Sequence, residues 1–129
     1  MTVLGRDECL RLLGAATIGR LAVTVDALPT VVPVTFRLVD RCILVRTGPG
    51  PRLAAAYDAV VAFEADDFDP ADRTGWSVVV IGVAREVPAG SEPVTELDPD
   101  SWPSRPDGRL VAITTEMVTG HRVTAGRGS

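Results

Sequence analysis

TIGRLAVTVDALPTVVPVTFRLVDRCILVRTGPGPRLAAA, residues 17–56, is the stretch that decides the fold. It holds three runs rich in β-branched residues, followed by Arg-Thr-Gly-Pro-Gly-Pro-Arg and a run of small residues. Such runs separated by short turns are typical of strands joined as hairpins. A glycine-rich turn before a helix favours an anion, because backbone N–H groups and the helix N-terminus both face it. The stretch therefore predicts a meander of strands that ends in a phosphate-binding turn.

Turn residues divide this stretch into its elements. Asp26–Leu28 and Asp40-Arg41 predict tight turns, because aspartate favours turn conformations. Pro33 lies inside the second strand and cannot donate to a strand ladder, so it marks an edge, a bulge or an opening of that strand. Pro51 suits the first turn of a helix that runs to about Asp58. The predicted strands are Ile18–Val25, Pro29–Leu38 and Cys42–Thr47.

The rest of the chain predicts further strands and one more helix. Acidic residues in a first turn, with Gly14 as a C-terminal stop, predict a short helix at Asp7–Leu13. The other expected elements are strands at Val60–Ala65, Trp76–Val87 and Leu110–Val123 (bent near Gly120), loops at Asp66–Asp72 and Ser91–Gly108, and a frayed tail at Thr124–Ser129. Several strands with one or two short helices predict a small barrel, formed by residues 1–129 as a single domain.

Composition narrows the function classes. The 129 residues are enough for one core, and 46% hydrophobic with 23% charged residues is ordinary for a globular protein. The net charge of −4 argues against non-specific nucleic-acid binding, which needs a basic face. No apolar run approaches the roughly 20 residues of a membrane span, and the N-terminus lacks the pattern of a signal peptide. We therefore expect a cytoplasmic protein with no nucleic-acid or membrane partner.

Residues suited to metal or acid–base chemistry are few. Cys9 and Cys42 form no C-x-x-C motif, and with the single histidine, His121, they fall short of the usual four zinc ligands. Reduced thiols are expected rather than a disulfide. Asp66–Asp72 lacks the spacing and glycine of a known calcium loop, which favours a solvated loop. His121 has no recognisable triad context, so we expect a structural strand residue, with contact to a cofactor or substrate as the alternative. The sequence predicts no metal site and leaves the catalytic residues unknown.

Several short blocks resemble the pyridoxamine 5′-phosphate oxidase-like split-barrel family. The match is to small actinobacterial flavin-nucleotide-binding proteins related to nitroimidazole reductases. Each block alone is weak, but together they span nearly the whole chain in the family's order. The blocks are Ile18-Gly19-Arg20-Leu21-Ala22, Val32-Pro33-Val34, Arg46-Thr47-Gly48-Pro49-Gly50, Arg52-Leu53, Thr74-Gly75-Trp76-Ser77-Val78 and Thr119-Gly120.

The resemblance implies a mainly β fold, a six-stranded antiparallel split β-barrel of the flavin mononucleotide (FMN)-binding type. It also implies a homodimer with FMN at two interface sites and a flavin-dependent oxidoreductase activity. Arg52 takes the place of the family's phosphate-binding basic residue, with Arg46 as its assistant, and Thr47 that of a strand-end hydroxyl. Trp76 and Ser77 fall near the phosphate and the ribityl chain.

Two further segments complete the site that the resemblance implies. The strand with Val32, Pro33 and Val34 would lie along the isoalloxazine edge, where backbone groups can bond the ring. Trp102, in the proline-rich loop, would cover the partner's flavin. Each side chain also has a structural alternative. These are a solvated helix residue for Arg52, an outward-facing strand residue for Arg46, a strand filler for Thr47, a barrel anchor for Trp76 and packing on its own barrel for Trp102.

The chain also departs from the family pattern. Thr35-Phe36 stands where relatives often carry Asn-Tyr, and Pro51 replaces a small polar residue and removes an N–H donor beside the phosphate turn. Two alternatives follow: a deazaflavin-dependent reductase, or a non-catalytic flavin- or haem-binding module. The net charge of −4 disfavours the deazaflavin, whose acidic tail suits a basic groove. The lack of a catalytic constellation fits flavin chemistry, because there the cofactor supplies the reactivity.

Overall fold

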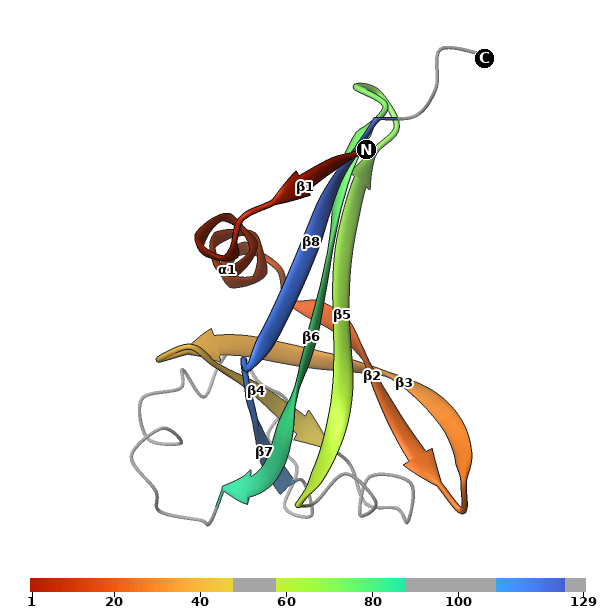
Figure 1. Ribbon diagram of the computed structural model, residues 1–129, viewed down its shortest axis with the longest axis vertical. Helices are drawn as coiled ribbons and strands as arrows, with labels where there is room; N and C mark the ends of the chain where they lie inside the picture. Colours follow the sequence, from red (N-terminus) through yellow and green to blue (C-terminus); the bar gives the residue numbers. More distant parts are fainter. Residues whose placement is uncertain (48–57, 88–108, 125–129) are drawn as a thin grey trace.

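The computed structural model describes residues 1–47, 58–87 and 109–124, which form eight strands and one helix (Figure 1). Along the chain, the elements are β1 (Thr2–Leu4), α1 (Arg6–Ala15), β2 (Ile18–Val25), β3 (Leu28–Val39), β4 (Cys42–Thr47), β5 (Ala59–Asp69), β6 (Thr74–Val87), β7 (Arg109–Thr114) and β8 (Met117–Thr124). The helix in this part of the chain is too short and too polar to cross a membrane.

Six of these strands close into a ring. The sheet order is β1-β8-β6-β5-β2-β3-β4-β7, and β7 also pairs with β6. All of the pairings are antiparallel. Strands β6, β5, β2, β3, β4 and β7 form the barrel, while β8 and β1 extend the sheet along the projecting half of β6 (Figure 1). The six-stranded split barrel expected from the resemblance is therefore the observed fold.

Two hairpins follow directly from local sequence. Asp26 and Ala27 have φ of 50° and 64°, and Asp40 and Arg41 have φ of 49° and 65°. Positive φ at both central residues is the type I′ turn, whose twist matches that of the strands it joins. The turns predicted at these two places are confirmed, and with them β2 and β4 at their predicted bounds.

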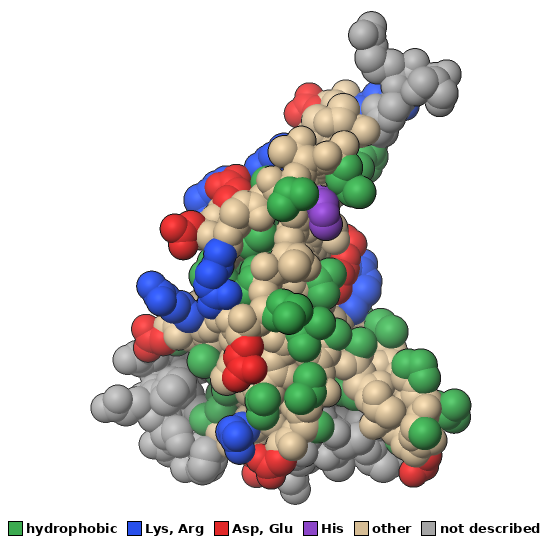
Figure 2. Space-filling view, in the orientation of Figure 1, with side chains coloured by type: hydrophobic (Ala, Val, Ile, Leu, Met, Phe, Trp, Pro, Cys, Tyr) green, Lys and Arg blue, Asp and Glu red, His purple; other side chains and the backbone are tan. Residues whose placement is uncertain are grey.

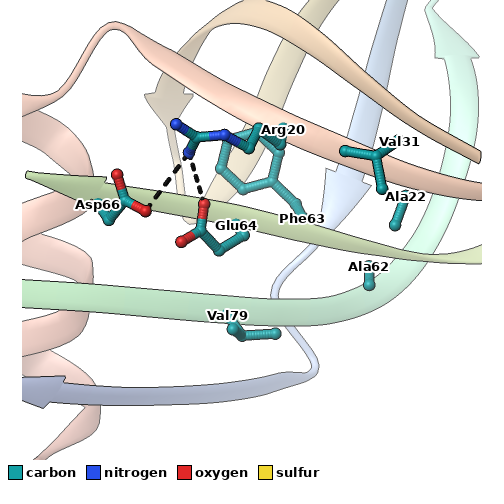
Figure 3. Close-up of a pocket in the computed structure, with 8 residues that line it drawn as sticks. All are labelled: Arg20, Ala22, Val31, Ala62, Phe63, Glu64, Asp66 and Val79. Carbon is teal, nitrogen blue, oxygen red and sulfur yellow. Dashed lines mark hydrogen bonds and ion pairs between the residues drawn. The ribbon is translucent and has the colours of Figure 1, made fainter.

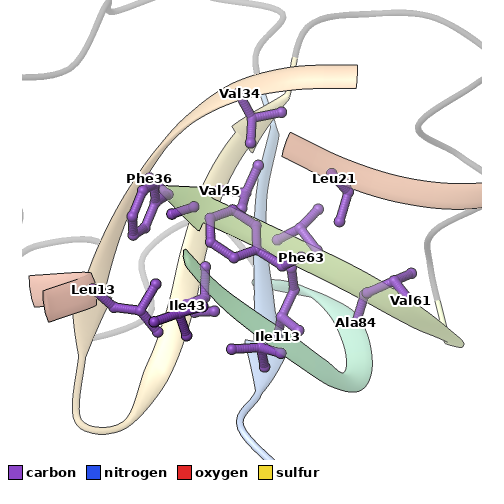
Figure 4. Close-up of a cluster of buried hydrophobic side chains, with 14 of the residues drawn as sticks. Leu13, Leu21, Val34, Phe36, Ile43, Val45, Val61, Phe63, Ala84 and Ile113 are labelled. Atoms are coloured by element: carbon purple, nitrogen blue, oxygen red, sulfur yellow. The ribbon is translucent and has the colours of Figure 1, made fainter. Parts of the chain in front are cut away.

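The core lies inside the barrel, where inward-facing residues of each strand meet (Figure 4). The rings of Phe36 and Phe63 pack edge-to-face at its centre, with centroids 4.7 Å apart and planes at 67°. Leu13 of α1 is fully buried against the same cluster and closes one end of the barrel. Burying a large apolar side chain stabilises a fold by about 1.5–3 kcal/mol, so this cluster holds the ring together.

Three predicted elements are wrong in their bounds. The segment Asp66–Asp72, expected as a loop, is a strand up to Asp69, because β5 pairs with β6 along its whole length. The last strand breaks at Thr115-Glu116 rather than bending at Gly120, because β7 closes the barrel while β8 pairs with the far half of β6. Helix α1 continues through Gly14 to Ala15.

Two other predictions concern the edges of strands. Pro33 lies in the half of β3 that pairs with β2, whereas the described pairing with β4 begins at Phe36. Among the described residues Pro33 therefore has a strand partner on one side only, which fits the edge explanation. The short strand β1, which pairs with β8, was not predicted from the sequence. The helix Pro51–Asp58 (apart from Asp58), the loop Ser91–Gly108 and the tail beyond Thr124 lie outside the described residues.

Candidate functional site

Five strands present one continuous surface away from the core, which we call the outer face. It comprises the outward side of β8, β6, β5, β2 and β3. Directly paired residues on antiparallel strands point to the same side of a sheet. The register places one row across all five strands, in the order Met117, Ile81, Ala62, Ala22, Val31. Every side chain in this row is apolar, which is unusual for a surface that faces solvent.

The surface is hollowed at Ala62 and Ala22, because these two small side chains lie between the larger side chains of Ile81 and Val31. A cavity of about 290 Å³ lies over the alanines (Figure 3). It is lined by Arg20, Ala22, Val31, Ala62, Phe63, Glu64, Asp66 and Val79. Its walls are mainly apolar, and its charged residues gather at one end. Figure 2 shows hydrophobic side chains gathered over β5, β6 and the β2–β3 hairpin.

A cluster of ionic and polar side chains forms the charged end. The guanidinium of Arg20 on β2 donates from Nη1 to Glu64 Oε1 at 2.7 Å and lies 3.5 Å from Asp66 Oδ2 (Figure 3). Ser77 Oγ on β6 donates to Glu64 Oε2 at 3.4 Å. Glu64 thus joins β2, β5 and β6 at the edge of the cavity.

The protonation of Glu64 is shifted by this setting. Burial raises the pKa of the Glu64 carboxyl above its ordinary value, and the neighbouring carboxylate of Asp66 raises it further. The guanidinium of Arg20 acts in the opposite direction but does not outweigh them. The hydrogen bond to Glu64 raises the pKa of Arg20, which therefore stays charged. A carboxyl with a raised pKa beside a fixed cation is a common feature of binding sites.

The structure separates the predicted pair Trp76 and Ser77. Trp76 packs against the hydrophobic core, on the same side of β6 as the buried Val78. This packing fits the barrel-anchor alternative, and the predicted contact of Trp76 with a cofactor stays a prediction. Ser77 lies on the outer face, and its register partner on β8 is His121. His121 therefore stands beside the charged cluster, although no hydrogen bond joins it to Ser77 in the described part of the chain.

The predicted strand along a flavin ring also divides between two faces. Val34 is buried in the core and Val32 packs against it, whereas Pro33 is exposed and pairs with Arg20. Phe36 is buried as well, so the phenol that relatives often carry at this position would lie in the barrel interior. Of the predicted ring-edge residues, Pro33 alone presents its side chain to the outer face.

The predicted phosphate turn is described only at its start. Arg46 is half-buried on β4, where it pairs with Leu110 of β7, and its Nε is shielded from solvent. Thr47 ends β4, and nothing is described of its side chain. Arg52 and Trp102 lie outside the described residues, so their predicted roles stay predictions.

Sequence reasoning missed Arg20, Glu64 and Asp66 as site residues. Arg20 stands in one of the family blocks without a predicted role, and Asp66 was expected in a loop. A usable signal was present, because Arg20 and Glu64 both stand at outward positions of strongly apolar strands. A charge at such a position is informative only when the neighbouring strand is known, and β2 and β5 are far apart in sequence.

Other features of the described residues carry less chemistry. No group of three or more potential metal ligands occurs among them, and Cys9 and Cys42 are both free thiols. Burial raises the pKa of the Cys9 thiol, which disfavours its reactive thiolate. A second cavity of about 280 Å³ lies between the end of α1 and β5, where Trp76 lines it with Asp66 and Asp67.

Comparisons with known proteins agree with this fold. The family model described as pyridoxamine 5′-phosphate oxidase matches residues 5–123. The chain is 42% identical over 132 aligned positions to the uncharacterised protein Rv0080 of Mycobacterium tuberculosis, covering 95% of this chain and 85% of that protein.

Solved structures agree as well. A protein of Mycobacterium smegmatis described as FAD-binding superposes with a TM-score of 0.82 at 36% identity, covering 97% of this chain and all of the other (100%). An FAD-binding protein of Mesorhizobium loti gives a TM-score of 0.75 at 26% identity, covering 95% of this chain and 97% of the other. With a family model that spans nearly its whole length, this chain belongs to the pyridoxamine 5′-phosphate oxidase-like family.

Proposed function

We propose that this protein is a cytoplasmic flavin-binding protein that acts as a flavin-dependent oxidoreductase, with FMN held at a homodimer interface. The observation that carries the proposal is the outer-face cavity, whose flat apolar floor and polar end suit a planar ring. It lies in a chain that is 36% identical to a protein described as FAD-binding. The described residues therefore fit the cofactor that the family resemblance implies.

The chain's own residues would divide the work of binding. Arg46, Thr47 and Arg52 would hold the phosphate, because a guanidinium matches phosphate with two parallel hydrogen bonds. Ser77 offers a hydroxyl on the outer face, and the backbone of Val32–Val34 offers ladder groups at the edge of β3. The bound flavin would supply electron or hydride transfer, while these residues bind, orient and exclude water.

The homodimer is supported by the apolar side chains of the outer face. Ile81 and Met117 are 39% and 58% exposed, and Val31 is 63% exposed. A second copy that covers this face would bury them and would enclose the cavity. Trp102 of the partner, from the proline-rich loop, would then cover the flavin.

The first test is an absorbance spectrum of the purified protein before and after it is mixed with FMN and desalted. Flavin bands that survive desalting are the expected result. Parallel titrations with FAD and a deazaflavin distinguish the cofactors, and a substrate screen with reduced protein tests the oxidoreductase activity. A protein that retains no flavin would contradict the proposal and favour the deazaflavin or a non-catalytic module.

Arg52→Ala tests the phosphate clamp. Loss of a charge-assisted, two-pronged contact should weaken FMN binding by about tenfold or more, measured by quenching of flavin fluorescence. Arg11→Ala is the matched control, because Arg11 is an exposed arginine on α1 whose partner is Glu8. Unchanged affinity in Arg52→Ala would show that another group holds the phosphate.

A further inference from the structure

We propose that the outer-face cavity binds a planar heteroaromatic ring with an adjacent acceptor and donor on one edge, so that Arg20 donates to the acceptor and Glu64 accepts from the donor. The inference rests on the proposed function, because it names residues that would recognise the ring of a flavin or of its electron donor. It assigns roles to Arg20 and Glu64, for which the resemblance implies none.

The floor of the cavity is shaped for a flat group. Ala22 and Ala62 are directly paired on β2 and β5, and Val31 and Ile81 flank them in the same register row. Two methyl groups between taller side chains leave a shallow trough. Val79 closes the side toward β6 (Figure 3). An aromatic ring can lie on such a floor and bury both its face and the alanine methyls.

The polar end of the cavity offers both kinds of hydrogen-bonding partner. Arg20 is oriented by Glu64 and Asp66, which both contact Nη1 (Figure 3). Among the described residues, no hydrogen bond occupies its Nε or Nη2. Glu64 Oε2 accepts only the long 3.4 Å bond from Ser77 there, so it can accept another. A donor and an acceptor side by side match an amide or imide edge.

Size and charge narrow the ligand further. A cavity of about 290 Å³ lies at the lower end of the usual range for small-molecule pockets, about 300–1,000 Å³, and suits a ring system. One guanidinium beside two carboxylates leaves no excess positive charge, so this end does not suit a phosphate. The imide edge of an isoalloxazine and the carboxamide of a nicotinamide share the required pattern. The experiment below separates these two sources.

Two variants test the floor. Ala62→Leu fills the trough, and Val60→Leu places the same side chain on the same strand at a site that is 70% exposed and outside the cavity lining. The probe for the flavin ring is lumiflavin, which lacks the phosphate and ribityl chain. Ala62→Leu should weaken lumiflavin binding by about tenfold or more, with Val60→Leu unchanged. Equal far-ultraviolet circular dichroism spectra confirm that both variants fold.

The polar edge is tested with an altered ligand, so that the wild-type protein itself is used. Lumiflavin methylated at N3 lacks the donor of its imide edge. Wild-type protein should bind it more weakly than lumiflavin, by about fivefold or more, and Glu64→Val should not distinguish the two. Arg20→Lys keeps the positive charge but loses the planar fork, and it should weaken both ligands.

The nicotinamide source is tested on FMN-loaded protein with tetrahydro-NAD, which cannot transfer a hydride. If Ala62→Leu weakens this probe and leaves lumiflavin binding unchanged, the cavity holds the nicotinamide of an electron donor. If Ala62→Leu weakens lumiflavin binding and leaves the binding of tetrahydro-NAD unchanged, the cavity binds the flavin ring. Both outcomes support the inference.

Unchanged binding of both probes in Ala62→Leu and Glu64→Val would overturn the inference. Failure of wild-type protein to bind FMN would instead refute the proposed function. The two failures are thus distinguishable, because one is measured on the variants and the other on the wild-type protein.

Discussion

Glu64 is the residue on which the outer-face cluster depends. It accepts from Arg20 on one neighbouring strand and from Ser77 on the other, and Asp66 lies two residues along its own strand. Its side chain is 29% exposed. An ionised carboxyl in this place therefore loses part of its hydration, which is why its pKa is raised.

Glu64→Gln is expected to change how stability depends on pH. The pKa of Glu64 is higher in the folded protein than in the unfolded chain. Glu64 therefore contributes fully to stability below pH 4.5, and this contribution is lost as the pH rises through the raised pKa. The unfolding free energy of the variant should therefore gain on that of wild type as the pH rises above 4.5. Urea unfolding at several pH values measures the difference.

Glu8→Gln is a control of opposite sign. The hydrogen bond from Arg11 lowers the pKa of Glu8, so its contribution is present above 4.5 and is lost as the pH falls through the lowered pKa. The unfolding free energy of wild type should therefore fall relative to that of Glu8→Gln as the pH decreases below 4.5. The same direction of change in both variants would contradict the assignment of Glu64.

At the scale of elements, β6 is the strand that joins the two parts of the sheet. It pairs with β8 up to Ile81 and with β7 from Ala84 onward. Between these points Val83 N–H donates to Thr114 Oγ1 at 2.9 Å. Gly82 lies at the crossing, and a Cβ there would meet the backbone carbonyl of Thr114.

Gly82→Ala should destabilise the fold, because a backbone carbonyl cannot move aside as a flexible side chain can. We expect a loss of about 1–3 kcal/mol in the unfolding free energy, as for other overpacked sites. Gly14→Ala is the matched control, since nothing lies within 4 Å of the Cβ it would gain and alanine favours the helix. Urea unfolding measures the stability of both variants. Equal stabilities would contradict the close approach of Gly82 to the backbone of Thr114.

The corner between β7 and β8 is fixed by a second set of contacts. Thr115 Oγ1 donates to the carbonyl of Arg41 at 2.7 Å and accepts from Arg6 Nη2 at 3.0 Å. Arg6 Nη2 also donates to the Thr115 carbonyl at 2.7 Å. These contacts tie α1 and the β3–β4 turn to the point at which the chain leaves the barrel.

Thr115→Val should cost about 0.5–1.5 kcal/mol, because the carbonyl of Arg41 loses its donor and Arg6 Nη2 keeps only the carbonyl of residue 115 as an acceptor. Thr119→Val serves as the control, since Thr119 is exposed on β8. Thermal unfolding of the two variants is the measurement. A Thr115→Val protein as stable as Thr119→Val would mean that water replaces the lost hydroxyl.

At the scale of the whole molecule, the outer face is a large apolar surface that no described element covers. The barrel interior is filled by its own side chains, and α1 covers one end. The apolar row on β8, β6, β5, β2 and β3 has no covering element among the described residues. A second copy would remove this row from water, which is the driving force for the proposed homodimer.

Ile81→Asp should weaken the proposed dimer, because it places a charge within the apolar row that the second copy would cover. Sedimentation equilibrium at micromolar concentration should show a dimer for wild type and a rise of about tenfold or more in the dissociation constant for the variant. Leu28→Asp is the control, because Leu28 is also apolar and is 67% exposed at the β2–β3 turn, outside the apolar row. A monomeric wild-type protein would contradict the interface, and the shared flavin site with it.

The sequence by itself determined the hairpins, the strands β2 and β4 and the class of fold. Positive φ at Asp26-Ala27 and Asp40-Arg41 depends on the turn residues and their immediate neighbours, so it can be predicted from a few positions. Alternation and β-branched residues likewise act within one strand. The family blocks added the six-stranded split barrel as the expected fold.

Only the tertiary structure decided which side chains meet on the outer face. Arg20 and Glu64 are 44 residues apart and become neighbours through the pairing of β2 with β5. The tertiary structure also places Asp66, expected in a loop, in strand β5, and it places Trp76 and Ser77 on opposite sides of β6. Register between distant strands is set by closure of the whole ring and by burial of one face, and no local stretch of sequence contains that information.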